Sequence, residues 1–226
     1  MLNIAIDGPG GAGKSTIARG VAARLGIVYV DTGALYRTIG LYVRRKEVDP
    51  SDCDAVAALL PEIGLEIRYE EDGQQVYLNG ERVGDAIRTP EMSHYASAVS
   101  ALPPVRAFLL DTQREIARKN NVIMDGRDIG TVILPDAQVK IFLTASAECR
   151  AERRYRELCA KGIETTLQQV LDDMNERDTR DSSRAIAPTA AAEDALLFDN
   201  TGMDADESIA YVLGIVHGKT GFTGGN

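Results

Sequence analysis

Apolar and polar positions divide the chain into short strands and amphipathic helices. Apolar runs that predict buried strands lie at 2–6, 27–30, 121–124, 139–143 and 196–199. Apolar residues recurring every three or four positions predict helices at 15–25, 32–45, 104–119 and 204–216. Two polar, Arg-rich helices are expected at 147–160 and 165–179, separated by residues 161–162. Strands joined through helices must run parallel, because each connection crosses back over the sheet. The order therefore predicts an α/β fold, a parallel sheet core flanked by helices.

The segment 64–87 departs from this pattern. Its short strand-like stretches are separated by an Asp-Gly pair at 72–73 and an Asn-Gly pair at 79–80, which predict an antiparallel meander of three strands. A meander has no place in a parallel sheet. We therefore expect an insert at about 62–90, mounted on the edge of a single domain that spans 1–226. The tail at 219–226 is rich in Gly and Thr, and we expect it to be flexible.

The composition is that of a globular protein. The 226 residues are 44% hydrophobic and 26% charged, enough for one core and a small inserted subdomain. No apolar run approaches the roughly 18 residues that a membrane span needs, and the chain opens on a strand without a basic-then-apolar leader. We expect a cytoplasmic protein without membrane contact. With no obvious exposed apolar stripe, a monomer is the default.

Cysteines and histidines give no pattern typical of a metal site. Cys53, Cys149 and Cys159 form no CxxC pair, and His94 and His217 lie far apart in the sequence. We expect three reduced thiols and two ordinary histidines.

The charges argue against nucleic-acid binding and for small phosphates. A net charge of -9 is opposite to the basic surface that a phosphate backbone requires. Of the 25 cationic residues 19 are Arg, and eight of these lie between 127 and 184. Arginine binds phosphate bidentately, whereas lysine is a mobile point charge. A solvated helix face with charge pairs explains Arg156 equally well.

A complete Walker A loop follows the first predicted strand at 8–15. Its glycines let the backbone wind so that successive N–H groups can point at phosphates, and the following helix adds its N-terminal dipole. Lys14 would reach the β- and γ-phosphates, and Ser15 would meet Mg²⁺. The loop predicts a nucleoside triphosphate site formed by Gly8, Pro9, Gly10, Gly11, Ala12, Gly13, Lys14, Ser15 and Thr16.

Other candidate residues follow the carboxyl ends of predicted strands, where open α/β sheets bind ligands. Asp125 ends a buried strand and is either a Walker B carboxylate near Mg²⁺ or a structural cap. Arg127 would face a phosphate or pair with a neighbouring Asp. Tyr36 and Arg37 open the second helix and could face an acceptor substrate, although a core ring and a solvent charge are equally typical of such positions.

The stretch 176–184 mixes Arg and Asp without apolar anchors. Arg177, Asp181 and Arg184 are three to four residues apart and would share one face of a helix. Periodicity alone favours a solvated face. An Arg-rich lid for phosphoryl transfer is the alternative.

Together these features favour a kinase. Phosphoryl transfer needs two substrates held in line, Mg²⁺, and cations around the transferring group, and arginines are abundant here. The helical pair at 147–163 and the insert could close over the site and exclude water. A kinase acting on shikimate, another nucleoside monophosphate or another small metabolite, and a regulatory switch NTPase, are the alternatives. The Asn-Lys-x-Asp element of guanine-specific switches does not occur in the sequence.

The chain resembles the bacterial cytidylate kinases of the nucleoside monophosphate kinase family from residue 4 to about 215. The matching motifs are DGPGGAGKS at 7–15, DTGALYR at 31–37, DGRDIGT at 125–131, VKIFL at 139–143, ERD at 176–178 and RD at 180–181. The resemblance implies Mg-dependent in-line transfer of the γ-phosphate of ATP to CMP or dCMP, giving CDP or dCDP. It also implies that the insert at 62–90 lies on the acceptor side and that 147–163 is a short lid.

The resemblance further implies roles for individual residues. Arg37 and Arg127 would hold the acceptor phosphate, beside Tyr36. The ribose would meet Ser97, Arg177 and Asp181, and the cytosine edge would meet Thr32, Arg106, Asp128 and Arg184. In the lid, Arg150, Arg153 and Arg154 could reach the donor phosphates, with Arg153 favoured over Arg156. The expected catalytic residues are Lys14, Arg127, Arg153 and Arg177, and the expected metal ligand is Ser15. Thr32 is a mild departure, since related chains often have Ser there.

Overall fold

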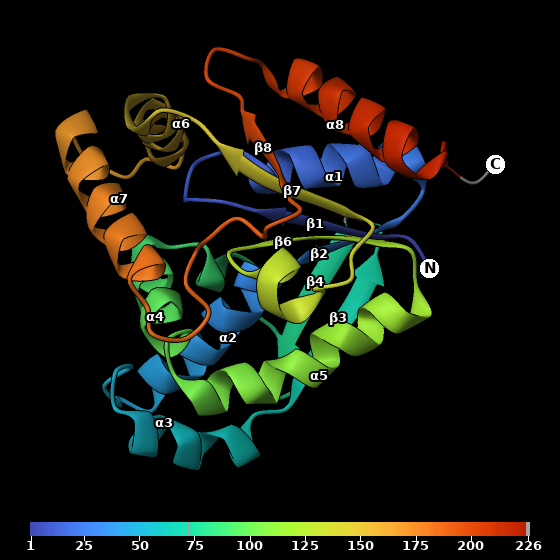
Figure 1. The fold of residues 1–226 in the computed structure, drawn as a ribbon. Helices are drawn as coiled ribbons and strands as arrows, with labels where there is room; N and C mark the ends of the chain where they lie inside the picture. Colours follow the sequence, from blue (N-terminus) through green and yellow to red (C-terminus); the bar gives the residue numbers. More distant parts are fainter. Residues whose placement is uncertain (72, 225–226) are drawn as a thin grey trace. The chain divides into compact units, whose positions relative to one another are not determined.

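The computed structural model describes residues 1–71 and 73–224. The chain divides into two compact units (Figure 1). One consists of Met1–Val28 with Asn120–Asn226 and the other of Tyr29–Lys119. The first contains the Walker A loop and the arginine-rich helices, and the second contains the expected insert.

The first unit is organised around a parallel sheet. Its strands are β1 (Asn3–Asp7), β6 (Val122–Gly126), β7 (Val139–Thr144) and β8 (Leu196–Asp199), and β2 (Val28–Asp31) begins at the unit boundary. The order is β2-β6-β1-β7-β8. Ile4 on β1 lies opposite Ile123 on β6 and Val139 on β7. The side chain of Ile4 is fully buried, as is typical of a central parallel strand.

Two helices of this unit pack against each other beside the sheet. They are α1 (Lys14–Leu25) and α8 (Ala205–Thr220) (Figure 1). A methyl group on Gly20 of α1 would lie 2.3 Å from Cδ1 of Ile209, so the absence of a side chain permits the close approach. Helix α8 begins with a capping box, in which Asp204 accepts a hydrogen bond from the N–H of Glu207 and Glu207 accepts one in return.

The helical pair α6 (Ala147–Ala160) and α7 (Leu167–Ser182) has a small core of its own. Ala151, Leu158 and Val170 are buried in this core. Gly162, in the turn between the helices, has φ of 70° and so adopts the left-handed conformation that glycine favours. The expected pair of polar helices around residues 161–162 is therefore confirmed.

Among its described residues, the second unit contains a separate antiparallel sheet and four α-helices. The sheet joins β3 (Leu65–Glu70), β4 (Gly73–Leu78) and the very short β5 (Glu81–Arg82), in that order. The helices are α2 (Thr32–Arg45), α3 (Cys53–Leu59), α4 (Pro90–Val99) and α5 (Pro103–Lys119), with short 3₁₀ helices at Leu60–Glu62 and Gly84–Ile87. Apolar side chains from the helices and the sheet share one core, which includes Leu35, Val76 and Leu109.

Most elements lie where the sequence predicts them, but several helical segments do not follow from it. Helices α3 and α4, the two short 3₁₀ helices and the π-helix η3 (Ile129–Ile133) fall where no helix was expected. Helix α8 continues to Thr220 rather than ending at 216. Asp72 of the expected 72–73 turn, and residues 225–226 of the expected flexible tail, lie outside the described residues.

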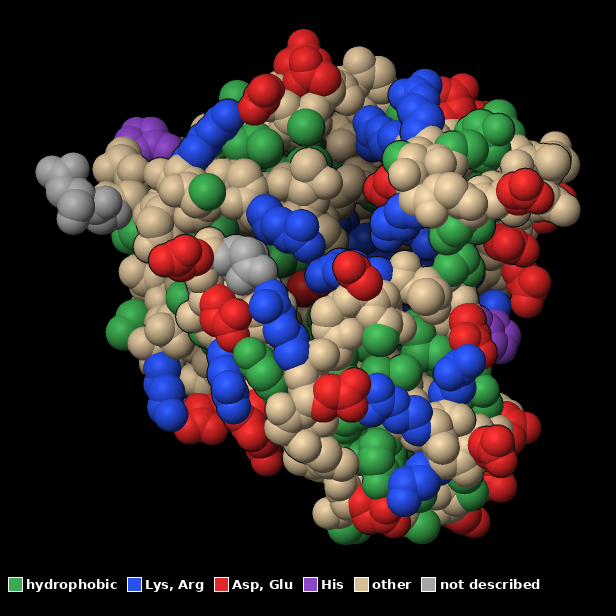
Figure 2. Space-filling view, turned by 180° about the vertical axis from the view of Figure 1, so that it is seen from behind, with side chains coloured by type: hydrophobic (Ala, Val, Ile, Leu, Met, Phe, Trp, Pro, Cys, Tyr) green, Lys and Arg blue, Asp and Glu red, His purple; other side chains and the backbone are tan. Residues whose placement is uncertain are grey.

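Acidic and basic side chains are interspersed on the face of the molecule in Figure 2, with hydrophobic side chains in small groups. Within residues 1–71 and 73–224, every helix is too short or too polar to cross a membrane.

Candidate nucleotide site

The glycine-rich loop connects β1 to α1 through a conformation that only glycine accommodates. Gly8 has φ of 143°, and a Cβ there would lie 1.9 Å from the carbonyl oxygen of Leu143 on β7. Gly13, at the N-cap of α1, has φ of 89°. The loop therefore packs tightly against the sheet and leads its backbone directly into the N-terminus of a helix.

The side chain of Lys14 lies buried against its own loop. Its Nζ donates to the carbonyl oxygens of Gly8, at 2.8 Å, and Pro9, at 2.6 Å. Burial lowers the pKa of Lys14 well below its usual range, and the positive charges of Arg127 and Arg177 lower it further, while Asp125 opposes them. A bound polyphosphate would favour the charged form of this lysine.

Ser15, in the first turn of α1, lies next to Asp125 near the carboxyl end of β6. The Ser15 hydroxyl donates to Oδ2 of Asp125 at 2.6 Å, and Asp125 is buried. Asp125 thus lies where a Walker B carboxylate would lie, next to the serine of the loop.

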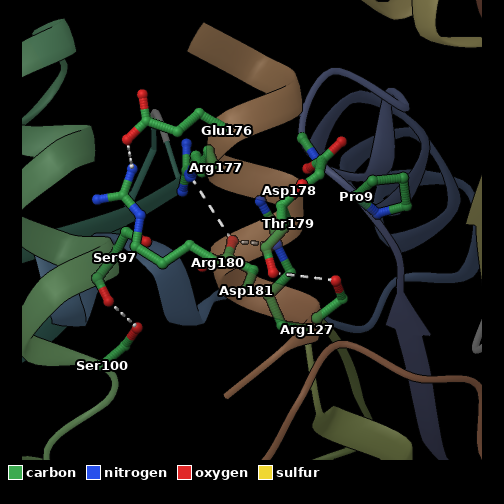
Figure 3. Close-up of polar contacts among 12 residues, drawn as sticks. Pro9, Ser97, Ser100, Arg127, Glu176, Arg177, Asp178, Thr179, Arg180 and Asp181 are labelled. Carbon is green, nitrogen blue, oxygen red and sulfur yellow. Dashed lines mark hydrogen bonds and ion pairs between the residues drawn. The ribbon is translucent and has the colours of Figure 1, made fainter.

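Three arginines surround the carboxylate of Asp181 in the first unit. The Nε atoms of Arg127 and Arg177 lie 3.2 Å and 3.7 Å from Oδ2 of Asp181, and Nη2 of Arg184 lies 3.8 Å from Oδ1. Figure 3 shows Arg127 and Arg177 reaching Asp181 from different sides. Asp181 is only 3% exposed, so the solvated-face interpretation of these positions is wrong. Because arginine can contact phosphate bidentately, this cluster is a candidate phosphate site.

The solvated face of α7 is instead the one that carries Glu176 and Arg180, which form an exposed ion pair at 3.3 Å (Figure 3). Arg127 does pair with an aspartate, as one interpretation expected. That aspartate is 54 residues away rather than a sequence neighbour. The guanidinium of Arg127 also lies beside the glycine-rich loop, since a Cβ on Gly10 would be 3.6 Å from its Nη2.

Helices α6 and α7 hold the peptide groups of Gly10 through one ion pair. Arg150 pairs with Asp178 and donates to the carbonyl oxygen of Gly10 at 3.1 Å. The N–H of Gly10 donates to the other oxygen of Asp178 at 3.3 Å. The helical pair is thereby joined directly to the phosphate-binding loop.

Arg153 contacts the same loop from α6 and is held by neutral oxygens. Its guanidinium donates to Oδ1 of Asn200 at 3.0 Å, and to the carbonyl oxygens of Asn200, Met203 and Ala12 at 3.1, 3.3 and 3.4 Å. By contrast, Arg156 is exposed and pairs with Glu152 at 3.1 Å along its own helix. The expectation that Arg156 belongs to a solvated helix face is confirmed.

These contacts predict different effects for two arginines of the same helix. We expect Arg153→Ala to lower kcat/KM for ATP by about 10- to 100-fold, because a cation beside the phosphate loop is lost. The matched variant Arg156→Ala removes only a surface ion pair and should change kcat/KM less than about twofold. Steady-state kinetics with ATP as the varied substrate measures both. Equal effects of the two substitutions would show that Arg153 has no special role.

In the second unit, Asp31 organises the N-terminus of α2. Its carboxylate accepts from the N–H of Ala34 at 2.8 Å and pairs with Arg37 at 2.9 Å. Arg37 is therefore no solvent charge. Among the described residues, the buried Nε of Arg37 has no hydrogen-bond partner. Such an unsatisfied donor is suited to binding an anion.

The remaining candidate residues of this unit lie near α2, at α4 and at α5. Tyr36 is buried in the core. The Cζ atom of Arg106 lies 5.8 Å from the centroid of the Tyr36 ring, within the range of a cation–π contact. Arg106 donates to the carbonyl oxygen of Ser100, whose hydroxyl donates to the carbonyl oxygen of Ser97 (Figure 3). Thr32 is buried at the first position of α2.

The expected substrate residues thus form two groups, one in each unit. Arg127, Asp128, Arg177, Asp181 and Arg184 belong to the first unit with the Walker A loop, and Thr32, Tyr36, Arg37, Ser97 and Arg106 belong to the second.

The sheet, the loop at 8–15 and the Ser15–Asp125 pair define a P-loop nucleotide-binding protein. A solved structure from Eubacterium ventriosum, titled as an uncharacterized protein, has a similar fold, with a TM-score of 0.53, 15% identity, and coverage of 96% of this chain and 98% of that one. Within this class, the family model described as cytidylate kinase matches residues 4–218. The chain belongs to the cytidylate kinase family.

Individual relatives agree over nearly the full length. The cytidylate kinase of Carboxydothermus hydrogenoformans is 47% identical over 96% of this chain and 98% of its own. The cytidylate kinase of Caldicellulosiruptor bescii is also 47% identical, over 94% of each chain.

Sequence reasoning missed two residues that contact the loop. Asn200 donates through Nδ2 to the carbonyl oxygen of Ala12 at 3.2 Å, and Asp178 accepts from Gly10. Asp178 could have been found in the Arg-rich stretch at 176–184. Asn200 follows β8 without any motif, so only the fold brings it to the loop.

Proposed function

We propose that the protein transfers the γ-phosphoryl group of ATP to CMP or dCMP, producing ADP and CDP or dCDP. The observation that carries this proposal is membership of the cytidylate kinase family across residues 4–218, together with a complete P-loop at 8–15. We propose a monomer as the working unit.

On the donor side, the loop at 8–15 binds the phosphates of ATP through its backbone N–H groups, and Lys14 supplies a cation. The hydroxyl of Ser15 and the carboxylate of Asp125 are hard oxygen donors 2.6 Å apart, a set that suits Mg²⁺. When bound there, Mg²⁺ would neutralise charge on the β- and γ-phosphates. Among the described residues there is no cluster of three or more His, Cys, Asp and Glu, so phosphates and water would complete such a site.

On the acceptor side, Arg37 and Arg127 hold the phosphate of CMP. Ser97, Arg177 and Asp181 bind the ribose, and the base is recognised by Thr32, Arg106, Asp128 and Arg184. A carboxylate that accepts from the cytosine amine, with arginines that donate to its ring nitrogen and carbonyl, matches the hydrogen-bonding edge of this base.

The reaction then needs positioning and positive charge more than a base. Arg127 and Arg177, which share Asp181 in this structure, would exchange that carboxylate for the transferring phosphoryl group. Arg153, held by carbonyl oxygens, keeps its whole charge available to the donor phosphates.

The direct test is ADP formation from Mg-ATP with CMP, dCMP, UMP, AMP, GMP, shikimate or no acceptor. We expect ADP with CMP and dCMP, less with UMP, and almost none without an acceptor. Turnover with shikimate or another acceptor alone would make the protein a different P-loop kinase. Turnover without any acceptor would favour an NTPase switch.

A single substitution tests the division between donor and acceptor residues. Asp128→Ala should lower kcat/KM for CMP by about 100-fold or more, because the cytosine amine loses its buried acceptor. The Kd of ATP, measured by calorimetry without CMP, should change less than about twofold. A loss of ATP binding would contradict the assignment of Asp128 to the base.

A further inference from the structure

Asp7 is a buried carboxylate that joins two motifs with separate roles. It is the last residue of β1, directly before the P-loop, and is 4% exposed. Its Oδ1 accepts from the N–H of Ile129 and its Oδ2 from the N–H of Gly130, each at 2.7 Å. One side chain therefore bonds the start of the phosphate loop to the segment that carries Arg127 and Asp128.

The segment that Asp7 bonds is the π-helix η3 (Ile129–Ile133). Such helices are rare, short and frequent at functional sites. Asp128 directly precedes this helix. The N–H groups of its first two residues, Ile129 and Gly130, donate to Asp7, which lies 122 and 123 residues earlier in the sequence.

The packing around this contact is close. A Cβ on Gly130 would lie 3.3 Å from Oδ2 of Asp7 and 3.2 Å from Cδ of Lys140. The ammonium of Lys140 is directed to Asp194, with which it pairs at 2.8 Å. The glycine at 130 therefore allows the carboxylate to reach both N–H groups.

We propose that Asp7 is a positioning residue for recognition of CMP: by accepting from both N–H groups at the start of η3, it fixes the turn that carries Arg127 and Asp128. This proposal rests on the proposed function, in which Asp128 binds the base. Without Asp7, the turn would lose both of these hydrogen bonds, and Arg127 and Asp128 would be positioned less precisely for CMP.

The ionisation of Asp7 adds a distinctive pH dependence. Burial raises the pKa of Asp7 to about 6, and the charge of Asp128 adds to the rise, while the two N–H donors and Lys14 oppose it. The folded-state pKa is above the ordinary value of 3.8, so Asp7 contributes stability below about pH 4 that is lost as the pH rises through about 6. Capping of both N–H groups needs the carboxylate and improves over the same range. Stability and CMP recognition should therefore change in opposite directions.

The experiment compares Asp7→Asn with wild type and with Asp204→Ala, which removes the N-cap side chain of α8. At pH 8 we expect Asp7→Asn to lower kcat/KM for CMP at least tenfold, and to change the Kd of ATP less than threefold. Asp204→Ala should lower the thermal unfolding temperature and leave both constants within twofold. Similar kinetic effects of the two variants, or equal losses for CMP and ATP, would overturn the proposal.

The pH profile provides the decisive measurement. The ratio of wild-type to Asp7→Asn kcat/KM should fall toward one between pH 8 and pH 5, and the ionisation of CMP itself cancels in this ratio. A ratio independent of pH would reduce Asp7 to a structural cap. If Asp7→Asn does not fold, Gly130→Ala crowds the same contact and should give a milder loss with the same preference for CMP over ATP. Wild-type protein that does not phosphorylate CMP would refute the proposed function, independently of this proposal.

Discussion

Replacing Lys14 by Met should lower kcat by about 100- to 1000-fold with every acceptor nucleotide, the usual effect of removing one group that stabilises charge in a transition state. Lys14 is buried at the phosphate loop, where its ammonium would contact the β- and γ-phosphates. Its loss also leaves the carbonyl oxygens of Gly8 and Pro9 without these donors, at a cost of about 1–3 kcal/mol in stability. Initial rates at saturating ATP and CMP measure the effect on turnover.

A matched surface substitution distinguishes the loss of any lysine charge from the loss of a catalytic group. Lys119→Met removes an exposed lysine that pairs with Glu115, and kcat should stay within twofold of wild type. A Lys14→Met variant with a raised KM for ATP but unchanged kcat would show that Lys14 binds substrate and transition state equally well. Its catalytic assignment would then be wrong.

The parts that the sequence predicts best are those encoded locally. The glycine loop, the strand before it and the helix after it are adjacent in sequence, and apolar runs mark each buried strand. Helix α4 could also have been predicted, because Thr89 caps it through the N–H of Met92 and Pro90 occupies its first position. The π-helix η3 has no such pattern, because its conformation depends on a carboxylate from β1.

The contacts that complete the candidate site link residues far apart in the chain. Arg150 and Gly10 are separated by 140 residues, and Asn200 and Ala12 by 188. Neither pair follows from local periodicity, since strand order and the packing of α6 decide which side chains meet the loop. The resemblance supplies residue roles that spacing alone leaves open. The spacing of Arg177, Asp181 and Arg184 favoured a solvent-exposed helix face. The fold instead buries the carboxylate of Asp181 between the arginines.

Asp181→Asn should be the most destabilising single substitution of a charged residue in the first unit. The side chain of Asp181 is 4% exposed and lies within ion-pair distance of Arg127, Arg177 and Arg184. Removing one partner of a buried ion pair costs about 3–5 kcal/mol, because the remaining charges lose their compensation. Asparagine has nearly the same size as aspartate and preserves the packing, so the loss of stability measures the effect of removing the negative charge. Urea denaturation at neutral pH measures the change in the free energy of unfolding.

The control for this variant is Glu176→Gln on the same helix, which removes an exposed partner of Arg180 and should cost less than about 1 kcal/mol. Binding gives a second result. Because the proposed acceptor site uses Asp181 and its arginines together, the Kd of CMP should rise at least tenfold in Asp181→Asn and stay within twofold in Glu176→Gln. If bound CMP restores most of the lost stability of Asp181→Asn, the phosphate can replace the carboxylate among the arginines, and Asp181 then serves mainly to hold these cations together until the substrate arrives. If Asp181→Asn unfolds like wild type, the three arginines do not depend on this carboxylate, and the charge cluster has been misassigned.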